Sequence, residues 1–146
     1  RNAEKIVKSE NFKKLKGTVI GRSDFVGSLN KNKPFVDTKT TYNHVLKLLR
    51  KLKKRKIITK MGGSITSNSK SFIEKLSKKG LLDIIETRNI EFFTNKKNIN
   101  NLDEIIREIF LFELNWLKYT TQRIKNKNKK KDFYSRIKEI NKRLKK

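Results

Sequence analysis

The stretch of sequence that decides the fold is IITKMGGSITSNSKSFIEKLSKKGLLDIIE, residues 57–86. It begins with a short apolar and β-branched run over residues 57–61, which is typical of a buried strand. After a loop of Gly, Ser, Thr and Asn, Ser69 can cap a helix. Gly80 suits the position that follows a helix C-terminus, and residues 81–86 predict the next strand.

The same alternation of strand and helix extends upstream. Residues 18–23 are predicted to form a strand, and residues 5–8 give a further strand signal. A loop over residues 24–34 leads to a helix expected over residues 38–54, whose apolar side chains recur at helical spacing: Tyr42, Val45, Leu49 and Leu52. The fold class predicted is α/β, a mixed β-sheet flanked by two helices, with a C-terminal helical extension.

From residue 101 the pattern becomes helical. Residues 102–117 are apolar over a wide arc, so this helix is expected to contact a neighbouring protein or the body. Residues 126–131 are predicted to form a solvated or RNA-contacting turn, and a last helix with heptad spacing is predicted from Asp132. The domain boundaries expected are 1–98 for an α/β RNA-binding body and 99–146 for a basic helical extension.

The charge of the chain points to a polyanionic partner. Its 146 residues include 39 Lys and Arg against 14 Asp and Glu, a formal net charge of +25. A compact domain with this charge repels itself, and nucleic acid is the first candidate partner because each neutralised phosphate releases counterions. No apolar run approaches the roughly 20 residues that a membrane span needs, so no membrane is expected.

The residue content argues against a metal centre and against catalysis. The chain has no cysteine and a single histidine, His44, which excludes zinc fingers, disulfides and thiol chemistry. Metal-dependent nucleases need several converging carboxylates, and the sequence shows no convincing cluster. We therefore expect no enzyme activity, metal, cofactor or small-molecule substrate. A nuclease that uses Asp83 is kept as an alternative hypothesis, after RNA binding and DNA binding.

The strongest candidate phosphate site is the glycine- and serine-rich loop that opens the second helix. Glycines allow a phosphate to approach the backbone, and the amides at a helix N-terminus attract anions. The loop lacks Walker spacing, so it does not imply nucleotide hydrolysis. The residues predicted to bind RNA here are Gly62, Gly63, Ser64, Ser67, Asn68, Ser69 and Lys70.

Further RNA contacts are predicted at bases in loops and at helix ends, because proteins recognise folded RNA mostly by shape, 2′-hydroxyls and phosphates. An ordinary solvated loop is an equally good interpretation of Lys31 and Lys33. The residues of this group are Arg22, Lys31, Lys33, Lys53, Lys54, Arg55, Asn95, Lys96, Lys97, Lys129, Lys130 and Lys131.

The order of these pieces over residues 5–95 resembles the eleventh small-subunit ribosomal protein family. Residues 17–21, GTVIG, are similar to that family's G-N-V-I-x-W strand, and residues 33–35, KPF, to its K-S-T-P-F entry into a long helix. The loop over residues 62–69 sits where the family has G-P-G-S-G-R-E. The resemblance implies a structural constituent of the ribosome that binds small-subunit ribosomal RNA on the platform and contacts neighbouring ribosomal proteins.

Departures from the family pattern imply a divergent, mitochondrial member. Residues 93–97, FTNKK, replace the family's P-H-N-G stretch. Lys, Asn and Ile are abundant, and their codons are rich in A and T. The alternative location is therefore the cytoplasm of an organism with an A/T-rich genome. Two other identities stay open. One is the large-subunit ribosomal protein eighteen family, and the other is a DNA-binding module with a helix-turn-helix that begins in residues 42–58.

Overall fold

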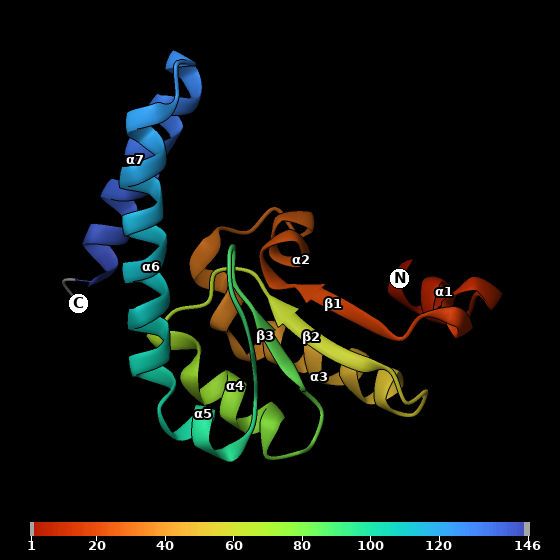
Figure 1. Ribbon diagram of the computed structural model, residues 1–146. Helices are drawn as coiled ribbons and strands as arrows, with labels where there is room; N and C mark the ends of the chain where they lie inside the picture. The colour runs from red at the N-terminus through yellow and green to blue at the C-terminus, as the bar shows by residue number, and fades with distance from the viewer. Residues whose placement is uncertain (1, 145–146) are drawn as a thin grey trace. The chain divides into compact units, whose positions relative to one another are not determined.

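The structure, a computed structural model, describes residues 2–144, without the side chains of residues 2–4 and 13 (Figure 1). The chain divides into two compact units, Arg1–Leu102 and Asp103–Lys146. The first unit contains both strands and helices, and the described part of the second unit, residues 103–144, contains only helices.

The first unit is built on a four-stranded mixed sheet with the strand order β1-β2-β3-β4. The pairs β1–β2 and β2–β3 are parallel, and β3–β4 is an antiparallel hairpin. The predicted α/β class with a mixed sheet is confirmed. The strand bounds are Gly17–Gly21 for β1, Ile58–Gly62 for β2, Ile84–Glu86 for β3 and Glu91–Phe93 for β4.

Helices connect the parallel strands. The side chain of Thr38 caps the longest helix of this unit by accepting from the amide of Thr41, and Gly80 has a φ of +63° just after another helix, as predicted. The helical elements of the unit are α1 Asn2–Lys8, η1 Glu10–Lys14, α2 Arg22–Ser28, η2 Lys33–Asp37, α3 Lys39–Lys53, η3 Ser67–Ser69, α4 Lys70–Ser77 and α5 Lys96–Asn100.

Three local predictions for the first unit are wrong. Residues 5–8 lie in α1, where Val7 is buried and Ile6 is exposed, so only one of these two apolar side chains faces the core. The first five residues of the predicted 24–34 loop, residues 24–28, lie in α2. The helix-turn-helix interpretation fails because β2 lies between α3 and α4 in the chain.

One face of the sheet is buried and the other is open. The register places Ile20, Met61 and Ile85 in one row, and all three are buried. Val19 and Phe93 belong to the alternate row and are 46% and 64% exposed. Right-handed crossovers place α3 and α4 on the same face, where their apolar side chains supply the core: Val45, Leu49, Leu52, Phe72, Ile73 and Leu76.

The second unit is an antiparallel pair of helices, α6 Leu102–Arg123 and α7 Lys127–Leu144. Arg136 donates to both carboxylate oxygens of Glu113, at 2.8 and 2.7 Å. The rings of Trp116 and Phe133 lie 5.9 Å apart. The strongly apolar α6 therefore packs on α7 along part of its surface.

The last helix starts earlier than the sequence predicts. The side chain of Asn126 accepts from the amide of Lys129 at 3.0 Å, which caps α7 and makes the basic run from Lys127 its first turns. The predicted turn over residues 126–131 is wrong, because an asparagine cap compensates for the weak apolar pattern there.

Candidate nucleic-acid interface

Within the first unit, the residues predicted to bind RNA lie at opposite ends of the sheet. Arg22 and the loop after β2 follow two neighbouring parallel strands, so they lie together at the carboxyl-terminal end. α3 runs back along the sheet, and Lys54 and Arg55 therefore lie at the amino-terminal end, just before β2. The predicted residues are consequently not one site.

Arg22 is a core residue. Its side chain has no exposed surface, and its guanidinium donates to Asp37 Oδ1 at 2.6 Å, to the Gly63 carbonyl at 2.9 Å and to Ser69 Oγ at 3.1 Å. Burial lowers the pKa of Arg22 below its ordinary value, although the Asp37 carboxylate acts in the opposite direction. The RNA-binding prediction for Arg22 is wrong, because a buried and paired guanidinium is not available to a phosphate.

Gly63, the first residue after β2, is required by the packing of the strand-to-helix loop. Gly63 has a φ of +87°, and a Cβ added to it would lie 2.5 Å from the backbone nitrogen of Ser23. The hydroxyls of Ser23 and Ser64 are 3.0 Å apart. Packing against the residues that follow β1 therefore explains Gly63 without a ligand.

Members of this loop differ in their access to solvent. Gly62 and Ser69 are buried, so the predictions that they contact RNA are wrong. Ser69 instead accepts from Arg22 and from the backbone amide of Thr66. Gly63, Ser64 and Lys70 are half-buried, whereas Ser67 and Asn68 are exposed, so for these five residues RNA contact stays a prediction.

The other predicted contacts all reach the surface. Asn95 has a structural role as well, since its side chain caps α5 by accepting from the amide of Asn98 at 2.8 Å. RNA contact stays a prediction for the exposed Lys31, Lys33, Lys54, Arg55, Asn95, Lys96, Lys97, Lys129 and Lys131 and for the half-buried Lys53 and Lys130.

Exposed bases precede each of the three parallel strands. We call this group the basic edge; it consists of Lys14 and Lys16 before β1, Lys54, Arg55 and Lys56 before β2, and Lys78 and Lys79 before the turn that leads to β3. Parallel strands all start at the same end of a sheet, so the topology gathers these bases from three separate parts of the sequence.

Backbone contacts bring the three segments of the basic edge together. The amide of Ile58 donates to the Lys16 carbonyl at 3.0 Å, which joins the starts of β1 and β2. Thr59 Oγ1 donates to the Leu81 carbonyl at 2.9 Å, which joins the start of β2 to the segment after α4. Neighbouring strands lie about 4.8 Å apart, so the three segments that carry these bases lie side by side at one end of the sheet.

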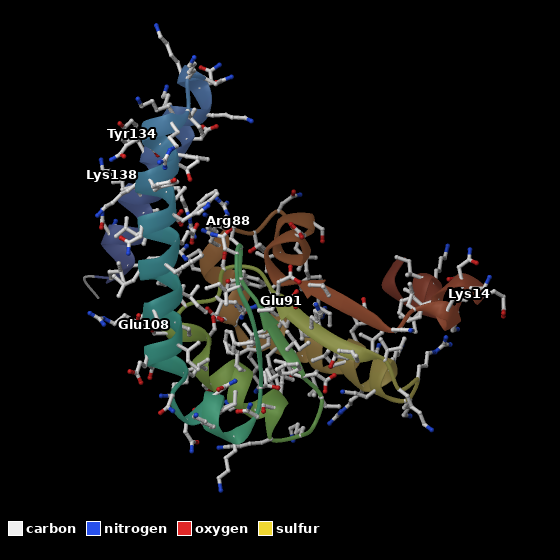
Figure 2. All side chains as sticks on the ribbon, in the orientation of Figure 1. Lys14, Arg88, Glu91, Glu108, Tyr134 and Lys138 are labelled. Carbon is white, nitrogen blue, oxygen red and sulfur yellow. The ribbon has the colours of Figure 1, made fainter. Side chains whose placement is uncertain are left out.

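The carboxyl-terminal end of the sheet carries acids together with bases. Figure 2 labels Lys14 at the amino-terminal end and Arg88 near the opposite end. The carboxyl-terminal end holds the acids Asp24, Asp37 and Glu86. Lysines in the last turn of α3 also offset the dipole of that helix, but Lys54 and Arg55 lie beyond it and are exposed.

Lys53 is turned inward from the basic edge by Asp83. The Asp83 carboxylate accepts from Lys53 Nζ at 2.6 and 2.5 Å and from the backbone amide of Thr59 at 2.8 Å. Burial alone would raise the pKa of Asp83, but the hydrogen bonds from Lys53 and Thr59 outweigh it and lower the pKa below its ordinary value. Asp83 therefore joins the end of α3 to the sheet.

We expect Asp83→Asn to lower the free energy of unfolding at neutral pH by about 1 kcal/mol, because the amide weakens charge-assisted bonds that solvent partly screens. A carboxyl whose pKa is lower in the folded state stabilises the fold above its unfolded pKa, near 3.9, and loses that contribution as the pH falls through the folded value. Urea unfolding between pH 7 and pH 2 should therefore show a weaker acid dependence in the variant.

The matched control is Glu91→Gln, which removes a carboxylate that pairs with Lys60 at 2.6 Å on the open sheet face. Because Glu91 is 46% exposed, its loss should change stability by less than about 1 kcal/mol. Equal acid dependence of Asp83→Asn and the unmodified chain would refute the role of Asp83.

Four members of the basic edge were not predicted from the sequence: Lys14, Lys16, Lys78 and Lys79. A signal for them exists, since each lies a few residues before a predicted strand. It becomes informative only when the strands are known to be parallel and adjacent, because only then do their starts share one end.

The described residues offer no metal site and no membrane span. Within residues 2–144, no three His, Cys, Asp or Glu side chains are grouped so that they could hold a metal ion. No helix in the same part of the chain is both long and apolar enough to cross a bilayer. The chain matches no protein-family model, no curated protein and no solved structure.

Proposed function

We propose that this chain is a non-catalytic RNA-binding protein that holds the phosphate backbone of folded RNA along its basic edge. The observation that supports the proposal is the meeting of seven exposed bases at the starts of three parallel strands. Cations in a row match the repeated charge of a nucleic-acid backbone and need no base-reading motif.

The assembly that we propose is the small subunit of a mitochondrial ribosome, with ribosomal RNA and neighbouring ribosomal proteins as partners. The support is the resemblance over residues 5–95 to the eleventh small-subunit ribosomal protein family. The net charge of +25 fits a component that RNA surrounds better than it fits a free monomer.

The test is the salt dependence of binding to a structured RNA stem-loop, measured by filter binding. We expect log K to fall linearly with log salt, with a slope of about −0.7 to −0.9 for every phosphate that is neutralised. A slope near zero would sink the electrostatic proposal. Tighter binding to duplex DNA would favour a DNA-binding module, and magnesium-dependent cleavage lost in Asp83→Ala would favour a nuclease.

A further inference from the structure

The outer edge of β1 offers hydrogen-bonding groups to solvent. The amide of Ile58 donates to the Lys16 carbonyl, and the register pairs Gly17 with Ile58, so Thr18 and Ile20 direct their backbone groups towards β2. The N–H and C=O of Val19 then point to the other side. In residues 2–144, no strand pairs with that side of β1.

An apolar pocket of about 870 Å³ adjoins this free edge. Its walls come from α1, η1, α2 and α3, and Val19 itself lines it. Val7, Phe12, Val45 and Leu52 are buried around it, whereas Ile6 is 57% exposed and Val19 is 46% exposed. The pocket can therefore receive apolar side chains from a chain that lies along β1.

We propose that an extended peptide segment of a partner protein adds a strand to the β1 edge and inserts alternate apolar side chains into this pocket. An extended backbone matches the free N–H and C=O of the edge, and a strand presents every second side chain to one face. Neither a helix nor a small apolar ligand would use the backbone groups of β1.

The charges around the edge select an acidic segment. The exposed Lys14 and Lys16 stand at the start of β1, where carboxylates of the peptide would meet them. A second copy of this chain suits the edge less well, because each copy has a net charge of +25 and two copies repel one another.

The test is selection from a displayed library of short random peptides with the full chain as the target. We expect enrichment of sequences that alternate apolar and other residues and contain Asp or Glu. The best peptide, made synthetically, is then titrated by fluorescence anisotropy against Val19→Pro and the matched control Val19→Ala. Proline removes the outward N–H but is tolerated in an edge strand, whereas alanine keeps that N–H.

The affinity for the peptide should fall by roughly tenfold in Val19→Pro relative to Val19→Ala, because one backbone hydrogen bond is lost and the added strand is displaced. Leu48→Gln, which makes the half-buried pocket lining polar, should weaken binding independently of the strand edge. Thermal melting identifies any variant that fails to fold, and RNA affinity should be the same for all three.

Four results would overturn the proposal. The first is equal peptide affinity of Val19→Pro and Val19→Ala, and the second is enrichment of peptides with apolar residues at helical spacing. The third is binding of dodecanoate in the pocket when the library yields no peptide. The fourth is a dimer in sedimentation velocity that Val19→Pro abolishes. The last two would identify a small apolar ligand or a second copy as the occupant. Both proposals use Lys14 and Lys16, but these four results do not measure RNA binding, which the salt dependence of RNA affinity tests separately.

Discussion

Asp37→Ala is expected to lower the free energy of unfolding by about 3 kcal/mol, the lower part of the range for breaking a buried ion pair from one side. The guanidinium of Arg22 is fully buried, and Asp37 Oδ1 lies 2.6 Å from it with 21% of the Asp37 side chain exposed. Without Asp37, a positive charge stays in the core with only neutral acceptors.

The effect should extend beyond the pair because Arg22 organises the carboxyl-terminal end of the sheet. Its guanidinium joins the start of α2 to the Gly63 carbonyl and to Ser69, and it lies 4.9 Å from the centre of the Phe72 ring. Urea unfolding monitored by circular dichroism measures the loss as a lower midpoint at an unchanged slope.

Asp24→Ala is the matched control. Asp24 is an exposed carboxylate two residues after Arg22, so its removal should cost less than about 1 kcal/mol. The double variant Arg22→Met with Asp37→Ala should lose less than the two single losses added together, because it leaves no unpaired charge. Additive losses would show that the two side chains act independently and would refute the ion-pair explanation.

The second large effect is expected in RNA binding. Reversal of three exposed bases of the basic edge, Lys16, Lys54 and Arg55, to glutamate should weaken affinity for a structured RNA on the order of a hundredfold at low salt. The slope of log K against log salt should become shallower by about 2, because the variant releases fewer counterions.

The matched control reverses Lys31, Lys33 and Lys39, which are exposed near η2 and the start of α3. Both triple variants change the net charge equally, so a general electrostatic effect lowers affinity equally in both. We expect the larger loss when the basic edge is reversed. A larger loss in the control would place RNA at the other end of the sheet, as the sequence-based prediction for Lys31 and Lys33 has it.

The sequence predicts the elements that rest on local chemistry. The run after Lys56 has β-branched residues that favour a strand, Thr38 caps α3, and Gly80 ends the helical segment that contains α4. Each of these elements is therefore predicted from a short window of neighbouring residues. The same windows fail for α1 and α2, where few apolar residues give an ambiguous pattern and packing against α3 decides the conformation.

By itself, then, the sequence determined that a strongly basic chain folds as alternating strands and helices, since charge and periodicity are properties of neighbouring residues. The tertiary structure alone decided which bases meet. Parallel pairing brings Lys16, Lys54 and Lys79 to one end of the sheet, and burial makes Arg22 part of the core although it resembles the surface bases in sequence. Strand direction and burial depend on residues far apart in the chain, which a local pattern does not contain.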